Sequence, residues 1–166
     1  MSVPILSLDA ERAIQVADER NGNSRLVHEQ VTGRILAAFF AVYRELGYGF
    51  AELVYLRAML LELSYRGVHA DQDVSLSVFY KGRKIGVFTA ALIVESKVVV
   101  ELSAGPQLLD ASRTQLLNYM RCSSAEVGML LHFGPKPEFR RLLGRCVVEQ
   151  GPNAADGVGR VQELLL

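Results

Sequence analysis

Residues 98–102 read Val98-Val99-Val100-Glu101-Leu102, and this stretch decides the fold. The three valines are apolar on both faces of an extended chain, which is typical of a central strand covered on both sides. A carboxylate at the end of such a run is costly unless it is paired, hydrated or bound to a cation. The sequence therefore predicts a covered sheet with either a functional carboxylate, Glu101, or a strand exit to solvent at this point.

The residues before this strand predict an antiparallel hairpin. Val74, Leu76 and Val78 alternate with serines, a turn follows at residues 81–84, and residues 85–94 form the returning strand. Residues 95–96 then make a second tight turn into the central strand. The hairpin is thus expected beside the central strand in one sheet.

Helical periodicity dominates the region upstream of the hairpin. From about residue 24 to residue 46 apolar residues recur at spacings of three and four, and a second such stretch covers residues 50–66. Gly47, Gly49 and Gly67 end these helices, because glycine is unfavourable in a helix interior and readily adopts positive φ. The two helices are expected to pack as neighbours.

The remaining elements complete a mixed α/β domain. A third helix is expected at residues 108–122, a strand at 127–132, a break at 134–137 and a short helix at 138–143. The predicted order is α-α-β-β-β-α-β-α, a mixed sheet with helices on its faces. We expect an N-terminal arm at residues 1–23, one domain at 24–150 and a C-terminal tail at 151–166.

Composition excludes several classes of protein. The 166 residues carry 18 basic and 18 acidic side chains, so a strongly cationic DNA-coating protein is disfavoured. Two isolated cysteines argue against a disulfide framework or a zinc site and favour a cytoplasmic protein. No apolar run approaches the length of a bilayer span, so we expect no membrane association.

The apolar content points to association with a partner. Half of the residues are apolar and the mean hydropathy is +0.20, which is high for a soluble monomer of this size. Residues 3–6 and 161–166 are apolar segments at the two ends. They are expected to pack either on their own domain or on a second copy, and a homo-oligomer is the favoured partner state.

Two helical motifs complete the set of candidate residues. Gly49-x-x-Glu52-x-x-Tyr55 places a carboxylate and a phenol on one helix face, and Gln115 and Tyr119 share a face of the third helix. Taken alone, each is an ordinary helix feature. They become informative through their order along the chain, together with residues 79–86 and 98–102.

With these motifs, residues 26–145 resemble the GxxExxY family, a group within the PD-(D/E)XK nuclease-like superfamily. The resemblance implies a restriction-endonuclease-like fold and a site with a helix Glu, a strand Asp and a following Glu-x-Lys. These carboxylates hold Mg²⁺, which activates water, and the lysine orients that water or stabilises the transition state. Glu52 and Glu101 match the two glutamates.

The same resemblance exposes two departures. Ala91 stands where the family has the metal-binding aspartate, and Ser103 stands where it has the lysine. The implied site is a degenerate pocket of Glu52, Ala91, Glu101, Ser103, Gln115 and Tyr119. We expect no cofactor, with a weakly held Mg²⁺ at Glu52 and Glu101 as the alternative.

Three functions follow as hypotheses. The favoured one is a non-enzymatic, self-associating or scaffold protein. The alternatives are a nucleic-acid-binding module and a residual Mg²⁺-dependent nuclease. Nucleic-acid contacts would use the basic hairpin tip or a second basic cluster; these residues are Lys81, Arg83 and Lys84, and Arg140, Arg141 and Arg145. His28, His69 and His132 are interpreted as structural, with His132 near the pocket.

Overall fold

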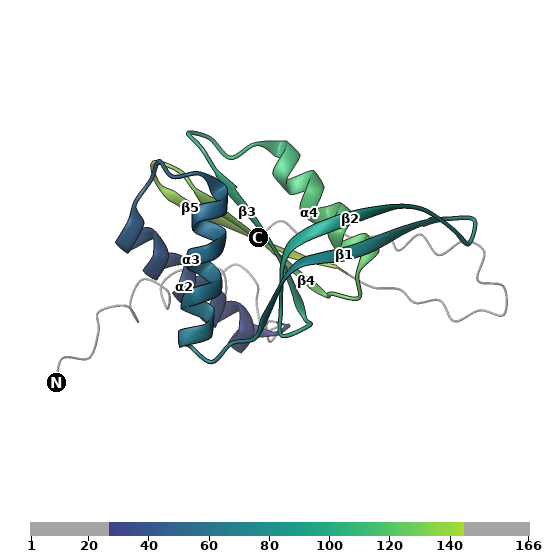
Figure 1. The fold of residues 1–166 in the computed structure, drawn as a ribbon, viewed down its shortest axis with the longest axis horizontal. Helices are drawn as coiled ribbons and strands as arrows, with labels where there is room; N and C mark the ends of the chain where they lie inside the picture. Colours follow the sequence, from purple (N-terminus) through teal and green to yellow (C-terminus); the bar gives the residue numbers. More distant parts are fainter. Residues whose placement is uncertain (1–26, 145–166) are drawn as a thin grey trace, which may run out of the picture.

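The computed structural model describes residues 27–144, which form a five-stranded sheet with helices on both faces (Figure 1). The predicted arm at 1–23, the whole predicted tail at 151–166, Arg145 and the apolar segments at 3–6 and 161–166 lie outside these residues. The elements in chain order are α2 (Glu29–Leu46), α3 (Glu52–Tyr65), β1 (Ala70–Tyr80), β2 (Arg83–Val94), β3 (Val98–Ala104), α4 (Asp110–Cys122), β4 (Val127–Phe133) and β5 (Pro137–Leu143).

The sheet has the strand order β1-β2-β3-β4-β5 and is mixed. The two turns join β1, β2 and β3 as antiparallel neighbours, and α4 forms the crossover to β4, which is parallel to β3. The central strand is therefore β3, buried along its length except for its last residue. This confirms the prediction made from its run of valines.

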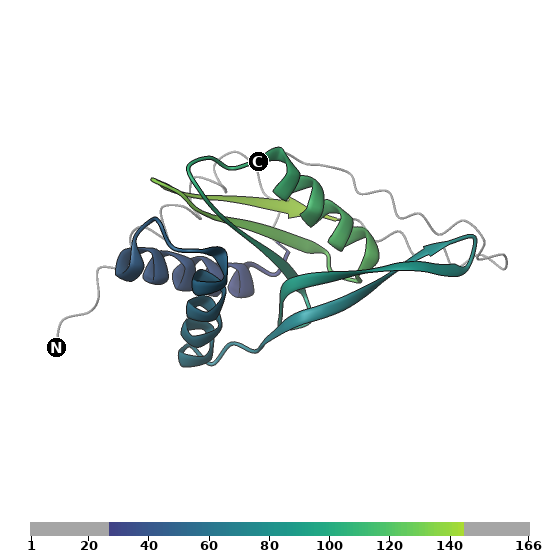
Figure 2. The ribbon, with the colours of Figure 1, turned by 45° about the horizontal axis from the view of Figure 1, so that its top comes forward.

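The helices lie on opposite faces of the sheet, with α2 and α3 on one face and α4 on the other (Figure 2). On the α2/α3 face, the ring of Phe133 stacks on Tyr55 with centroids 4.1 Å apart and meets the edge of Phe39 at 4.8 Å. On the α4 face, Gly128 permits a close approach, because a Cβ there would overlap the sulfur of Met120. The sheet thus separates two cores.

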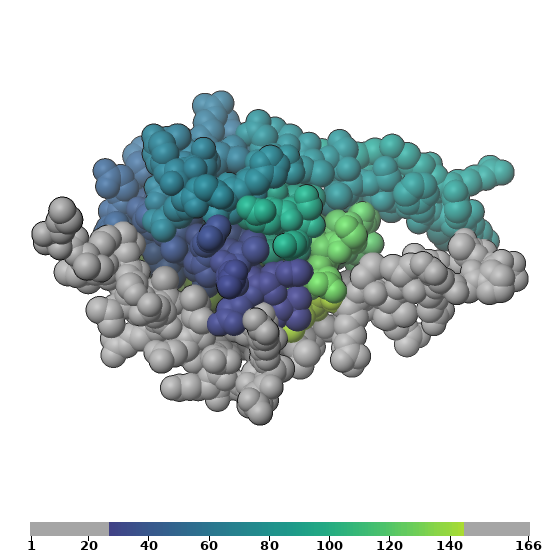
Figure 3. Space-filling view, turned by 90° about the horizontal axis from the view of Figure 1, so that it is seen from below, coloured from purple at the N-terminus to yellow at the C-terminus, as the bar shows by residue number. Residues whose placement is uncertain are grey.

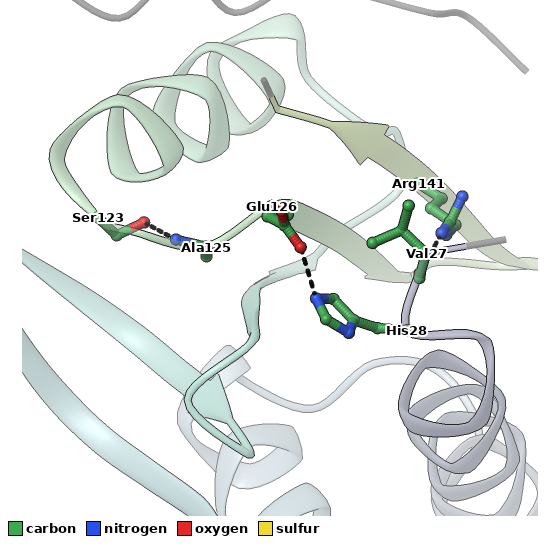
Figure 4. Close-up of polar contacts among 6 residues, drawn as sticks. All are labelled: Val27, His28, Ser123, Ala125, Glu126 and Arg141. Carbon is green, nitrogen blue, oxygen red and sulfur yellow. Dashed lines mark hydrogen bonds and ion pairs between the residues drawn. The ribbon is translucent and has the colours of Figure 1, made fainter. Parts of the chain in front are cut away.

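The helix α2 begins later than periodicity predicts. Its first residue is Glu29, preceded by His28 in the left-handed conformation with φ of 56°. Figure 4 shows His28 and Val27 at this entry, where His28 Nε2 lies 3.0 Å from a carboxylate oxygen of Glu126 and Arg141 donates to the carbonyl of Val27 at 2.7 Å. These contacts anchor the start of α2 to β5 and to the residue that precedes β4.

The last element corrects the sequence prediction. Residues 137–143 form the strand β5, antiparallel to β4, and not the predicted short helix. A segment of about six residues is too short for periodicity to separate the two states. Pairing with β4 satisfies backbone groups that the β4 edge would otherwise expose, and Phe139 packs on Phe40 with ring centroids 6.3 Å apart.

Within residues 27–144, none of the helices combines the length and apolarity of a membrane-spanning segment.

Candidate functional site

The motif around Glu52 is held in place by its tyrosine. Tyr55 is fully buried, and its hydroxyl donates to the carbonyl of Gly47 at 2.8 Å and accepts from the amide of Phe50 at 3.2 Å. The turn between α2 and α3 needs Gly47 and Gly49, which have φ of 66° and 118°. Tyr55 therefore fixes the turn that places Glu52 at the first position of α3.

Tyr55→Phe is expected to lower the free energy of unfolding by about 1–3 kcal/mol, because it leaves two backbone groups of the turn without their partner. Urea unfolding of both proteins measures this difference. Tyr65→Phe is the control, since Tyr65 is exposed on the same helix. Equal stability of wild type and Tyr55→Phe would contradict a structural role for the phenol.

Ala91 lies where the strands β2 and β3 stop pairing. The pairing of β2 with β3 runs from Val94 and Val98 to Leu92 and Val100, and it ends there. Ala91 and Glu101 are the next residues on the two strands. Ala91, which stands where the family motif has an aspartate, thus lies beside Glu101 at the point where the pairing of β2 with β3 ends.

Glu101 is a buried carboxyl group without a hydrogen bond to its Oε2. Burial, followed by repulsion from Glu52, raises its pKa to about 8. Glu52 is exposed as a residue, yet partial burial of its carboxyl group also raises its pKa. Since their charges interact, the structure brings the two predicted glutamates into one site.

The helix α4 supplies the third side of this site. Gln115 Nε2 donates to the hydroxyl of Tyr119, as expected for residues four apart on one face. Burial raises the pKa of Tyr119, and the charges of Glu101 and Glu52 raise it further. Tyr119 therefore lies within electrostatic range of both carboxyl groups, and its place in one pocket with them stays a prediction.

Ser103 is tied to a residue that sequence reasoning treated as structural. It is buried on β3, and its Oγ lies 3.2 Å from Nδ1 of His132, its register partner on β4. Burial lowers the pKa of His132, while Glu138 opposes this effect. Ser103 and His132 are each the sixth residue of their strands, a correspondence that depends on strand bounds and register that the sequence does not show.

The donor set does not fit a catalytic magnesium centre of the kind that the resemblance implies. Two carboxylates are present, position 91 offers a methyl group, and position 103 offers a hydroxyl already bonded to His132. Across residues 27–144, no group of three or more His, Cys, Asp or Glu side chains could hold a metal ion. A weakly bound cation at Glu52 and Glu101 stays a prediction.

The two basic clusters have different surroundings. Lys81, Arg83 and Lys84 are all exposed at the β1–β2 turn. Arg140 and Arg141 are successive strand residues that point to opposite faces. Arg141 has its pKa lowered by burial and bonds the carbonyl of Val27, so it serves the entry of α2 and forms no joint surface with Arg140.

Arg140 borders a cavity of about 290 Å³ between β5 and the start of α4. Its other charged lining residues are Arg113, Asp110 and Glu138. The ion pair of Arg140 with Glu138, at 3.4 Å, reduces its availability to an anion. The mixed charge of the lining makes it a poor phosphate site.

Comparison with known proteins agrees with this architecture. A family model of the PD-(D/E)XK nuclease superfamily matches residues 29–142, which is more than half of the chain. No curated protein and no solved structure matches. Membership of the narrower GxxExxY family stays a prediction. The match covers every described helix and strand apart from the last residue of β5, and on this ground the chain belongs to the PD-(D/E)XK nuclease superfamily.

Proposed function

We propose that this protein is a catalytically degenerate member of its superfamily that acts through binding, as a self-associating scaffold. The observation that supports the loss of catalysis is the pair of substitutions around Glu101. Ala91 removes a carboxylate where β2 leaves β3, and Ser103 replaces an ammonium group with a hydroxyl bonded to His132. Without these groups, phosphodiester hydrolysis loses a metal ligand and a transition-state donor.

Self-association is supported by the outer face of α3. Val54, Leu61 and Tyr65 follow one another at spacings of seven and four, and are 40%, 53% and 76% exposed. The opposite face of the same helix buries Tyr55, Met59 and Leu63. A helix that is apolar on both sides is normally covered on both sides.

A second copy of the chain is the occupant that we propose for this face. In a two-fold contact each protomer contributes the same three side chains, so the apolar surface of both protomers is buried. Burying one large apolar side chain contributes roughly 1.5–3 kcal/mol. Several such side chains together are needed to offset the entropy lost on association. The high apolar content of the whole chain supports the same proposal.

Leu61→Glu is expected to weaken self-association at least about tenfold, because two like charges would meet in the apolar contact. Size-exclusion chromatography with light scattering on the full-length chain measures the oligomeric state across a concentration series. Ser75→Glu adds the same charge at an exposed position of β1 and serves as the control. A chain lacking residues 161–166 tests whether the tail takes part.

A monomeric wild-type protein at every concentration would contradict the scaffold proposal. Loss of the oligomer in Ser75→Glu but not in Leu61→Glu would locate the contact at the β1 edge and contradict the α3 surface.

A cytoplasmic location is part of the same proposal, supported by the free Cys122, whose pKa is raised by burial.

A further inference from the structure

The β1–β2 hairpin extends beyond the rest of the sheet as a two-stranded ribbon (Figure 1). Pairing between β1 and β2 continues to Tyr80 and Arg83, whereas the last pair between β2 and β3 is at Leu92. In Figure 3 the teal hairpin extends past the purple and blue helices. Among the residues that the structure describes, the base of the ribbon contacts α4 through buried Leu76 and through Phe88, whose ring meets that of Tyr119.

The end of this ribbon carries large apolar side chains in solvent. Phe79, Tyr80 and Ile85 are 63%, 61% and 65% exposed. A soluble domain rarely keeps several neighbouring aromatic rings exposed unless they meet a partner. The ribbon end is therefore a candidate contact surface.

Each aromatic ring of the ribbon end faces a cation across the strands. Phe79 pairs with Lys84 and Tyr80 pairs with Arg83, and successive pairs point to opposite faces. Lys81 Nζ also lies 5.4 Å from the centroid of the Tyr80 ring. Both faces of the ribbon thus present a ring with a positive charge beside it.

No acidic residue lies between Val74 and Val94, so the three cations of the turn are uncompensated along this segment. The chain as a whole is neutral, with 18 basic and 18 acidic side chains. The positive charge at this end is therefore a local feature that favours a polyanionic partner.

We propose that the end of the β1–β2 hairpin, at residues 79–85, binds single-stranded nucleic acid. Aromatic side chains are platforms for unpaired bases, and neighbouring Lys and Arg side chains contact the phosphates. The alternation of ring and cation on both faces suits a strand that passes around the ribbon. This site is separate from the residues around Glu101 and from the apolar face of α3.

The order of residues at the tip disfavours two other partners. Insertion of the rings into a lipid layer would carry Lys81 in ahead of them and Arg83 and Lys84 in beside them, and charges in an apolar layer are costly. Contact between the tips of two copies would bring like charges together, which is unfavourable. Binding of a polyanion incurs neither the cost of burying charges nor the repulsion between like charges.

Fluorescence anisotropy of a labelled oligothymidylate with the full chain tests the proposal. Phe79→Ala and Tyr80→Ala are each expected to weaken binding about fivefold to a hundredfold, the equivalent of roughly 1–3 kcal/mol for one base stack. Arg83→Gln and Lys84→Gln are each expected to reduce the dependence of log K on log salt by about 0.7, the value for one phosphate contact on a single strand.

The controls match each change elsewhere on the surface. Tyr48→Ala removes an exposed ring from the turn between α2 and α3, and Lys97→Gln removes an exposed cation from the β2–β3 turn at the other end of the ribbon. Neither is expected to alter binding. Circular dichroism of the four tip variants should be unchanged, because the replaced side chains are exposed.

Parallel titrations with a single-stranded RNA, a DNA duplex and phosphatidylserine vesicles separate the partners. Binding of single strands that depends on Phe79 or Tyr80 supports the proposal. Absence of wild-type binding, equal losses in the control variants, tighter binding of the duplex without dependence on the rings, or binding of vesicles alone would each overturn it.

Discussion

The double variant Ala91→Asp/Ser103→Lys is expected to cleave nucleic acid with Mg²⁺ at a rate at least about 10²-fold above the wild-type protein, since one transition-state donor alone is worth about that factor. The change at position 91 adds a third carboxylate beside Glu101, at the point where β2 separates from β3. The change at position 103 adds an ammonium group on the same face of β3 as Glu101.

The local geometry explains why both substitutions are needed. An aspartate alone would add a third carboxyl group, whose charge repels that of Glu52 and further disfavours ionisation of Glu101, whose pKa is already raised to about 8 by burial and by Glu52. The lysine would replace the hydrogen bond of Ser103 with His132 and offset this repulsion with a positive charge. Each single variant is therefore expected to remain inactive.

The control variant keeps the side-chain volumes of the double variant and lacks its charges. Ala91→Asn/Ser103→Met occupies similar volumes without the carboxylate or the ammonium group, and it is expected to show no cleavage. Wild-type cleavage with Mg²⁺ or Mn²⁺ that Glu101→Gln abolishes would contradict the proposed loss of catalysis. An inactive but folded double variant would contradict the statement that these two positions disable the site.

Glu101→Gln is expected to stabilise the protein at alkaline pH and to leave its stability almost unchanged at acidic pH. The carboxyl group has a pKa near 4.5 when unfolded and about 8 when folded. Between these values the unfolded chain releases the proton and the folded chain retains it, so wild-type stability falls as pH rises. A glutamine resembles the protonated acid and avoids this loss.

The expected gain is on the order of 5 kcal/mol above pH 8, because each pKa unit corresponds to about 1.4 kcal/mol. Urea unfolding from pH 4 to pH 9 in the presence of a chelator measures the two curves. Glu45→Gln is the control, since Glu45 is exposed on α2. Parallel curves for wild type and Glu101→Gln would show that burial does not hold Glu101 protonated.

Much of the fold was predictable because local patterns and tertiary structure agree. The spacing of apolar residues predicts α2, α3 and α4, and alternation predicts the β1–β2 hairpin, although its turn is shorter than the predicted 81–84 because β2 begins at Arg83. The valines of β3 predict a strand buried on both faces. In these segments the chain has enough residues for the period of the apolar positions to be unambiguous.

The site was predictable in part, through its motif residues. The charges of Glu52 and Glu101 interact and Gln115 bonds Tyr119, while the role of these residues as one site stays a prediction. The contact of Ser103 with His132 was not predicted, because it depends on the parallel register of two strands separated by a helix. No local pattern specifies which residues become neighbours across such a crossover.

The sequence by itself determined where the helices and the first four strands form and that positions 91 and 103 lack a carboxylate and an ammonium group, because these depend on residue type and on short-range spacing. Only the tertiary structure decided that residues 137–143 form β5, that β2 leaves β3 beside Glu101, and that the end of the hairpin stands in solvent. These features arise from long-range strand pairing and burial, in which backbone groups and side chains find partners distant in the chain.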